Sequence, residues 1–280
     1  MIFTTRFAPS PTGPLHLGHA YSALLAHDMA RKASGRFLLR IDDLDQSRAR
    51  AHWEEQIKDD LHWLGVTWDG PVRRQSDHFD GYRDTLERLA DQGAVYPCSC
   101  KRRDIEAAAS AQQEGVPTHG PDGPIYPGTC RHRRFQDRQP GDALRLNLDK
   151  ACSARLPAIT ETGPAHKGAH EVTANYLKTC VGDPVLARPG MAASYNFAVV
   201  LDDAATEITH VIRGEDLFTA SYIQRVFQWQ LGLPAVCYHH HRLIRDEHGK
   251  RLAKRDDARA IATYRAEGAS PEDIRRMVGL

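Results

Sequence analysis

The first 41 residues alternate short apolar runs with one amphipathic stretch. Residues 2–7 have the composition of a strand, and the Pro/Gly-rich residues 8–14 follow as a loop. Apolar side chains then recur at helical spacing over about 16–33, and Gly35 marks the end of this helix. The continuous apolar run 37–41 suits a buried parallel strand that a right-handed crossover joins to the first. The pattern therefore predicts a β-α-β unit.

Two further amphipathic stretches follow this unit. Apolar residues form one stripe within 53–64, before Gly65, and another within 79–89, before Gly93. Each stripe predicts a helix that packs one face against the core. Ser76 is the predicted N-cap of the second of these helices, because its hydroxyl can accept from a free backbone N–H.

The periodicity weakens over residues 95–189, which we interpret as an insertion into the first fold unit. Gly, Pro, His and Cys are frequent in its first part, and residues 107–124 are predicted to be an excursion from the core. Regular patterning returns after the insertion. It predicts strands at 197–201 and 208–212 around a turn at 202–203, a helix over 217–231, and a last helix capped by Ser270.

Composition narrows the class of protein. The chain has 280 residues, of which 41 % are apolar, so it can bury a sizeable core. Its apolar runs are shorter than the roughly 20 residues that span a bilayer, and its first residues do not form a hydrophobic signal, so we expect a cytoplasmic protein. The net charge of +1 gives no general attraction for nucleic acid, but local basic clusters occur at 101–103, 131–134 and 242–259.

The loop at residues 8–14 leads into a helix N-terminus, where free backbone N–H groups and the helix dipole favour anions. Gly13 and Gly18 allow close backbone approach, and His16 and His19 can each donate a ring N–H to phosphate oxygens. A histidine pair alone is common in ordinary structure. Together with the preceding Ala-Pro-Ser-Pro-Thr-Gly, the pattern predicts a site for a triphosphate.

These motifs resemble the signature of glutamyl-type class I aminoacyl-tRNA synthetases. Residues 6–13 with 16–19 match its first block, and 40–45, 195–203 and 212–216 match further blocks in the same order. The resemblance implies an α/β fold with a Rossmann-like catalytic core that binds nucleotide at the carboxyl ends of its strands. It divides the chain into a core at 1–94 and 190–245, an acceptor-binding-type insertion at 95–189, and a tail at 246–280.

The tail contains Arg251-Leu-Ala-Lys-Arg255, which is similar to the family's mobile lysine loop. Lys254 takes the key lysine position, whereas Arg251 replaces the family's first lysine and Ala253 its serine. The resemblance therefore implies His16, His19 and Lys254 as catalytic residues. It implies an ATP site, with Mg²⁺ accompanying the nucleotide, made of Pro9, Ser10, Thr12, Gly13, His16, Gly18, His19, Arg251 and Lys254.

A glutamate substrate needs cations for its two carboxylates and an acid for its ammonium group. The resemblance implies Arg6 and Arg213 for the carboxylates and Asp42 for the ammonium, although most relatives carry the longer Glu at that position. Arg6 could instead pair with an acid at a sheet edge, and Tyr195 could be a core residue. The expected glutamate site is Arg6, Phe7, Ala8, Pro9, Ser10, Asp42, Tyr195 and Arg213.

The chain has six cysteines, and the close pair Cys98 and Cys100, followed by Cys130, favours a metal site over a disulfide in a reducing compartment. Zinc prefers a closed tetrahedral set of Cys and His ligands. By chemistry alone the fourth ligand could be His119 or His132, and the three thiols could also be plain structural cysteines. The short branch of the resembling family carries a Cys-x-Cys…Tyr-x3-Cys pattern, which implies one structural Zn²⁺ on Cys98, Cys100, Tyr126 and Cys130.

The acceptor of the activated glutamate is inferred from chain length and resemblance. Full-length relatives carry an anticodon-binding domain after the lysine loop, and we expect this chain to have none. The short branch transfers glutamate from glutamyl-adenylate to the queuosine base at the wobble position of tRNA(Asp), which implies a queuosine-bearing anticodon stem-loop as partner. The alternatives are a minimal synthetase that charges tRNA(Glu) and an inactive RNA-binding paralogue. We expect a monomer with no membrane association.

Overall fold

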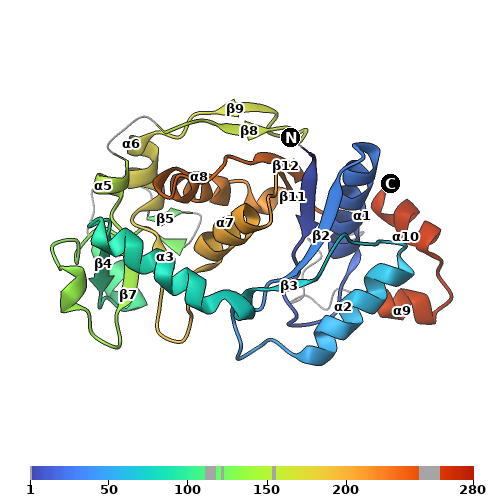
Figure 1. The fold of residues 1–280 in the computed structure, drawn as a ribbon, viewed down its shortest axis with the longest axis horizontal. Coiled ribbons are helices and arrows are strands. Elements are labelled where there is room, and N and C mark those ends of the chain that lie inside the picture. The colour runs from blue at the N-terminus through green and yellow to red at the C-terminus, as the bar shows by residue number, and fades with distance from the viewer. Residues whose placement is uncertain (1, 111–117, 121–122, 153–155, 246–258) are drawn as a thin grey trace.

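A computed structural model confirms the α/β architecture and describes residues 2–110, 118–120, 123–152, 156–245 and 259–280 (Figure 1). Its main sheet is built of two strand groups, in the order β1-β2-β3 and β11-β12-β8-β9. These strands are β1 (Thr4–Phe7), β2 (Arg36–Ile41), β3 (Arg73–Arg74), β8 (Ile159–Glu161), β9 (Gly168–His170), β11 (His210–Gly214) and β12 (Cys237–His241).

The two strand groups continue one another through β1 and β11. The backbone N–H of Thr209 donates to the carbonyl of Thr4 at 2.9 Å, and the Thr4 N–H donates to the Thr209 hydroxyl at 2.9 Å. Within the groups, β1, β2 and β3 are parallel, as are β11, β12 and β8, whereas β9 is antiparallel. The carboxyl ends of the parallel strands therefore meet along one edge, where ligands bind in open α/β sheets.

The predicted β-α-β unit is confirmed. Helix α1 (Leu17–Lys32) connects β1 to β2, and the two strands pair in parallel register. Gly35 follows this helix because a larger residue does not fit: a Cβ there would lie 2.2 Å from the carbonyl oxygen of Phe3. Both predicted helices after β2 are also present, as α2 (Ala51–Trp63) and α3 (Phe79–Asp91).

The prediction that Ser76 caps the helix at 79 is wrong. Ser76 lies inside a short 3₁₀ turn, η1 (Gln75–His78), and the residue at the cap position is His78, whose side chain makes no capping bond. The Ser76 hydroxyl and backbone N–H instead donate to the carboxylate of Asp43, at 2.6 and 2.8 Å. Ser76 therefore joins η1 to the end of β2.

The predicted strand at 197–201 and turn at 202–203 are also wrong. These residues belong to one helix, α7 (Tyr195–Ala205), in which the residues from Asn196 to Val200 are all buried. Residues 197–201 of this helix are all apolar, so this part of the sequence lacks the periodicity that separates a helix from a buried strand. The helix that follows is confirmed as η4 (Glu215–Leu217) and α8 (Ala220–Gln230).

The insertion at 95–189 contributes to three sheets, one of which is the two-stranded pair of β5 (His119–Gly120) and β6 (Gly123–Pro124). Strands β4 (Val95–Cys98), β7 (Ala143–Leu146) and β10 (Val185–Ala187) form a small antiparallel sheet away from β1 and β2 (Figure 1). Strands β8 and β9 instead hydrogen-bond into the main sheet. The other elements of the insertion are α4 (Arg102–Ser110), η2 (Phe135–Asp137), α5 (Leu148–Ala151), α6 (Ala174–Tyr176) and the π-helical turn η3 (Leu177–Val181).

Two C-terminal helices, α9 (Ile261–Ala266) and α10 (Pro271–Val278), pack beside the first β-α-β unit (Figure 1). The predicted N-cap is confirmed, because the Ser270 hydroxyl accepts from the Asp273 N–H and the Asp273 carboxylate accepts from the Ser270 N–H. Arg275 ties α10 to α1 by donating to Asp28 at 2.7 and 3.0 Å. The lysine loop at 251–255 lies outside the described residues.

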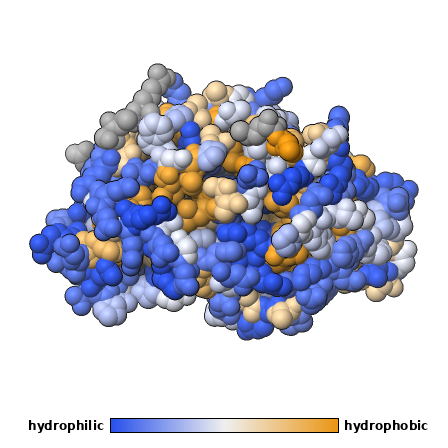
Figure 2. Space-filling model, in the orientation of Figure 1, coloured by the Kyte–Doolittle hydropathy of each residue, from blue (hydrophilic) through white to orange (hydrophobic). Residues whose placement is uncertain are grey.

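Figure 2 shows the face of the molecule drawn in Figure 1. Its edges are mostly hydrophilic, and hydrophobic residues gather near α7 and α8. Beneath it, one large buried cluster joins the insertion to α7 and α8, and a second joins β1, β2, α1 and α2 to the C-terminal helices. Among the described residues, no helix has both the length and the apolar character required to cross a membrane.

Candidate active site

A cavity of about 570 Å³ opens at the carboxyl ends of β1, β2, β11 and β12. Its wall includes every residue predicted for the glutamate site and most of those predicted for ATP. Gly13 is not among the lining residues, and Arg251 and Lys254 lie outside the described part of the chain. The predicted residues that line it are Arg6, Phe7, Ala8, Pro9, Ser10, Thr12, His16, Gly18, His19, Asp42, Tyr195 and Arg213.

The cavity wall also contains polar residues to which the sequence prediction gave no role. Asp45 and Asp216 stand within the quoted motifs 40–45 and 212–216, so the motifs already contained them. Gln75 directly follows β3. Because ligands bind at the carboxyl ends of parallel strands, Gln75 could have been predicted if this two-residue strand had been predicted. The further polar lining residues are Ser22, Arg48 and His241.

The N-terminus of α1 faces the cavity with two histidines. His16 is the N-cap residue, and its Nδ1 accepts from the Gly18 N–H at 3.1 Å, while Nδ1 of His19 accepts from the His16 N–H at 3.2 Å. Because Nδ1 accepts in both rings, the hydrogen of each neutral imidazole is on Nε2. The rings lie 3.7 Å apart between centroids. A pair of Nε2–H donors beside a helix N-terminus is suited to phosphate oxygens.

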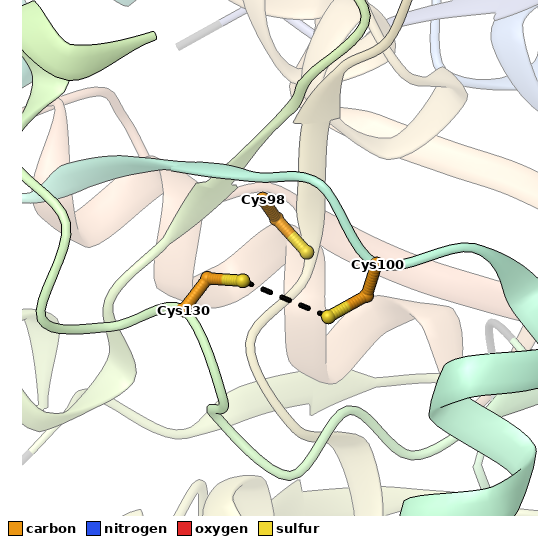
Figure 3. A group of neighbouring side chains, drawn as sticks. All are labelled: Cys98, Cys100 and Cys130. Atoms are coloured by element: carbon orange, nitrogen blue, oxygen red, sulfur yellow. Dashed lines mark hydrogen bonds between the residues drawn. The ribbon is translucent and has the colours of Figure 1, made fainter. Parts of the chain in front are cut away.

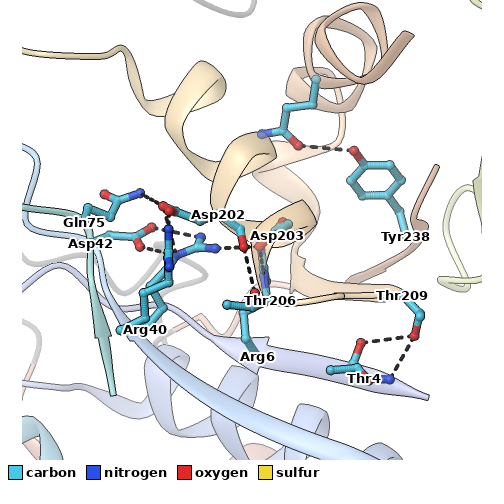
Figure 4. A network of polar contacts seen from close by, with 12 residues as sticks. Thr4, Arg6, Arg40, Asp42, Gln75, Asp202, Asp203, Thr206, Thr209 and Tyr238 are labelled. Atoms are coloured by element: carbon cyan, nitrogen blue, oxygen red, sulfur yellow. Dashed lines mark hydrogen bonds and ion pairs between the residues drawn. The ribbon is translucent and has the colours of Figure 1, made fainter. Parts of the chain in front are cut away.

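A network of buried ion pairs joins four charged residues, of which Arg6 and Asp42 line the cavity (Figure 4). Arg40 donates to Asp42 at 2.7 Å and to Asp203 at 2.5 Å, and Arg6 donates to Asp203 at 2.9 and 3.3 Å. Burial raises the pKa of Asp42 despite the nearby Arg40. For Asp203 burial acts in the same sense, but the charges and hydrogen bonds of the two guanidinium groups outweigh it and lower the pKa.

This network changes how Arg6 is interpreted. Two of its guanidinium nitrogens, Nε and Nη2, donate to Asp203. This agrees with the alternative that Arg6 pairs with an acid, but the acid lies on helix α7 and not at a sheet edge. Asp42 is already a partner of Arg40, but a carboxylate has about four acceptor positions and can still receive an ammonium group. The substrate roles of Arg6 and Asp42 stay predictions.

Arg213, the last residue but one of β11, has a different arrangement. Its Nε donates to His240 at 3.0 Å, and its Nη2 donates to the Ser221 hydroxyl at 2.8 Å and to the Leu217 carbonyl at 3.2 Å. Its Nη1 is buried and has no hydrogen-bond partner among the described residues. A buried donor without a partner is costly, and a substrate carboxylate would satisfy it. Tyr195, at the start of α7, is 38 % exposed and thus is not a core residue.

The cysteine cluster lies away from this cavity, where β4 ends. The sulfurs of Cys98, Cys100 and Cys130 converge within 4.8 Å of one another, and those of Cys100 and Cys130 are 3.6 Å apart (Figure 3). Two thiolates on a tetrahedral Zn²⁺ with Zn–S bonds of about 2.3 Å would be about 3.8 Å apart. The spacing of this pair therefore fits zinc.

The fourth zinc ligand also finds support in the geometry. The Tyr126 hydroxyl lies 3.8 Å from the Cys100 sulfur and accepts from the Cys130 backbone N–H at 2.8 Å. Neither His119 nor His132 belongs to the group of donor atoms that the described residues bring together. Burial raises the pKa of the Tyr126 phenol, so it would bind as phenolate only where a cation displaces its proton.

Comparison with known proteins identifies the class. The family of class I tRNA synthetases for glutamate and glutamine, catalytic domain, matches residues 3–280. The chain belongs to this family and is therefore a ligase of the aminoacyl-tRNA synthetase class, with the catalytic fold that the sequence predicted. A solved glutamate tRNA ligase from Elizabethkingia meningosepticum, in complex with its amino acid, is 28 % identical with a TM-score of 0.79; the alignment covers 100 % of this chain and 61 % of that one.

Curated relatives narrow the comparison. The glutamyl-Q tRNA(Asp) synthetase of Rhodobacter capsulatus is 62 % identical over 279 residues, which are 99 % of each chain. The glutamate–tRNA ligase of Aquifex aeolicus is 36 % identical, and the alignment covers 96 % of this chain but 55 % of that protein. A methionyl-tRNA synthetase from Mycobacterium tuberculosis, 12 % identical with a TM-score of 0.62, shares the fold.

Proposed function

We propose that this protein activates L-glutamate with ATP and Mg²⁺ and transfers it to the queuosine base of tRNA(Asp). The observation that carries the activation step is the cavity at the strand ends. It combines Nη1 of Arg213, which is buried without a hydrogen-bond partner in the described part of the chain, with the Nε2–H donors of His16 and His19. The transfer step is supported by the 62 % identity to the glutamyl-Q tRNA(Asp) synthetase of Rhodobacter capsulatus. The protein acts in the cytoplasm as a monomer.

Activation requires positioning more than acid–base chemistry. The substrate carboxylate is already ionised, so its oxygen attacks the α-phosphorus of ATP directly, and pyrophosphate leaves. His16 and His19 donate to phosphate oxygens at the α1 N-terminus, and Mg²⁺ accompanies the triphosphate. Arg213 holds a carboxylate of the amino acid and Asp42 receives its ammonium group. Pro9, Ser10 and Thr12 line the same wall and bring the backbone close to the substrates.

Transfer consumes the mixed anhydride formed in the first step. A hydroxyl of the queuosine cyclopentene-diol attacks the glutamyl carbonyl and forms an ester. AMP leaves with the electron pair of the broken acyl C–O bond, and the hydroxyl proton passes to solvent. This diol resembles the ribose cis-diol that ordinary synthetases use as acceptor. Single-stranded anticodon bases can be splayed into such a cavity, which a paired stem cannot enter. One structural Zn²⁺ on Cys98, Cys100, Tyr126 and Cys130 would hold the insertion around β4 together.

Pyrophosphate exchange into ATP tests the first step. We expect the purified protein to exchange label with L-glutamate and without tRNA. From the sequence, Lys254→Ala should slow exchange on the order of 10²–10³-fold, by analogy with removal of one preorganised donor to a developing charge. Lys32→Ala, a change at the far end of α1, is the matched control. Absence of exchange in the wild type would favour the inactive RNA-binding paralogue.

The acceptor is tested with labelled glutamate. We expect label on queuosine-containing tRNA(Asp), on its isolated anticodon stem-loop, and on tRNA whose 3′ terminus has been removed. A minimal synthetase is the second candidate, because the Aquifex aeolicus glutamate–tRNA ligase is 36 % identical. Labelling of queuosine-free tRNA(Glu) at its 3′ adenosine would establish that second candidate instead.

A further inference from the structure

Next to Arg213, two buried residues that do not line the cavity form a hydrogen-bonded pair. Nδ1 of His240 lies 2.5 Å from Oε2 of Glu161, and both residues are nearly inaccessible, at 1 % and 2 % exposure. The other Glu161 oxygen accepts from the backbone N–H groups of His240 and Gly163, at 3.0 and 2.5 Å. Neither Glu161 nor His240 lines the cavity. Their connection to it is Arg213, whose Nε lies 3.0 Å from Nε2 of His240.

These contacts determine where the imidazole proton sits. Burial disfavours ionisation of Glu161, but the hydrogen bonds from His240 and Gly163 outweigh it and lower the pKa to about 2. An ionised carboxylate only accepts, so Nδ1 of His240 must carry the hydrogen. A guanidinium only donates, so Nε2 must keep its lone pair for Arg213. The neutral Nδ1–H tautomer is the one form of His240 that satisfies both neighbours.

The same contacts determine the orientation of the guanidinium. Nε of Arg213 is held by His240, and Nη2 is held by Ser221 and Leu217, so the group cannot rotate without losing bonds on two sides. Nη1 is the nitrogen that the described protein groups leave for a ligand. A cation fixed in this way loses less side-chain entropy when it binds a carboxylate than a mobile one does.

We propose that Glu161 and His240 are positioning residues that set the tautomer and the orientation through which Arg213 binds a carboxylate of glutamate. The inference rests on the proposed function, since it assigns Arg213 to the amino acid. It adds two residues that touch neither substrate. Their effect should appear in the affinity for glutamate and not in the affinity for ATP.

Glu161→Gln tests the tautomer. If the oxygen of the new amide keeps accepting from the two backbone N–H groups, its NH₂ group faces Nδ1 of His240. That NH₂ group donates, so Nδ1 must then be an acceptor without a hydrogen. The ring hydrogen then moves to Nε2, where it opposes the Nε–H of Arg213. We expect the KM for glutamate in pyrophosphate exchange to rise roughly 10- to 100-fold, the range for a lost charge-assisted hydrogen bond, with the KM for ATP little changed. The control is Glu55→Gln, whose side chain is 71 % exposed.

Two changes at His240 separate positioning from simple packing. His240→Gln places a carbonyl oxygen near the former Nε2, where it can accept from Arg213, whereas His240→Leu fills similar volume with no acceptor. We expect His240→Gln to keep a lower KM for glutamate than His240→Leu. Equal glutamate KM values in the two variants, at equal thermal stability, would overturn the positioning role.

A spectroscopic measurement tests the proton directly. In ¹⁵N-histidine-labelled protein, the His240 signals, assigned by their loss in His240→Gln, should report the neutral Nδ1–H tautomer in the wild type and the Nε2–H tautomer in Glu161→Gln. An imidazolium or Nε2–H form in the wild type would overturn this inference. If the wild type shows glutamate-dependent pyrophosphate exchange and Glu161→Gln has an unchanged KM for glutamate, the positioning role is overturned. The proposed function is not affected by that result. Lack of any glutamate-dependent exchange in the wild type would overturn the proposed function itself.

Discussion

The cavity and the cysteine cluster are built in opposite ways. Residues from Arg6 to Ile244 line the cavity, so distant parts of the chain must fold together before it exists. The sulfurs of the cluster come from Cys98 to Cys130, within one segment. Next to the cavity, guanidinium and carboxylate groups already neutralise each other. The cysteines could act together as thiolates only with a cation between them, because their negative charges would otherwise repel one another. The comparison teaches that the protein itself stabilises the cavity, whereas the proposed zinc would stabilise the cysteine cluster.

The largest expected effect is on the metal. Cys98→Ser removes one sulfur ligand of the proposed zinc. We expect bound zinc to fall from one per chain to almost none after dialysis, measured by metal analysis. The control is Cys237→Ser, which lies outside the cluster, and this variant should retain one zinc per chain. The cysteine cluster does not line the cavity. We therefore expect the rate of pyrophosphate exchange to fall only slightly, while amide hydrogen exchange shows a large loss of local order around β4. Equal loss of both would contradict the separation of the two regions.

The next effect is on the ion pairs next to the cavity. Asp203→Asn leaves the guanidinium groups of Arg6 and Arg40 buried without their shared carboxylate. We expect the free energy of unfolding to fall by about 3–5 kcal/mol in urea denaturation. The exposed Asp80, paired with Arg83 on the surface of α3, provides the control, and Asp80→Asn should change stability by less than about 1 kcal/mol.

Asp60, on helix α2, is a buried carboxyl group that differs from the paired carboxylates next to the cavity. It is 1 % exposed, neither of its oxygens has a hydrogen-bond partner among the described residues, and burial followed by the charge of Asp59 raises its pKa to about 6. A raised carboxyl pKa means that the folded state prefers the protonated form. Stability from this group is therefore full below about pH 3.8 and declines as pH rises to about 6.

Asp60→Asn should accordingly stabilise the protein at pH 7.5, by about 2–3 kcal/mol for a shift of roughly two pKa units. The gain should shrink towards zero near pH 4, where the wild-type carboxyl is protonated in the folded state. Thermal unfolding of both proteins at the two pH values measures this. A gain that is the same at both values would show that the charge of Asp60 is not its cause.

The smallest expected effect distinguishes the fourth zinc ligand. Tyr126→Phe keeps the ring, including its stacking under Arg145, and removes only the oxygen near Cys100. We expect zinc to be lost faster to a chelator than from the wild type, but more slowly than from Cys98→Ser. His132→Ala should retain zinc as the wild type does. The reverse order for these two variants would assign the fourth position to His132.

The sequence by itself determined the elements whose evidence is local. The β-α-β unit, the Gly35 stop after α1 and the Ser270 cap of α10 could all be predicted, because each depends on neighbouring residues and on one apolar face. The motifs also identified most residues of the cavity wall, since each motif ends a strand or begins a helix at the same edge of the sheet.

Only the tertiary structure decided what depends on distant partners. Part of helix α7 was predicted as a strand at 197–201 and a turn at 202–203, because the apolar run 197–201 shows no helical periodicity. Arg6 pairs with Asp203, Arg213 with His240, and His240 with Glu161. The members of each pair are far apart in the chain, and no local pattern encodes such a pair. A sequence lists the charged groups that must be neutralised when buried, but the fold chooses which group neutralises which.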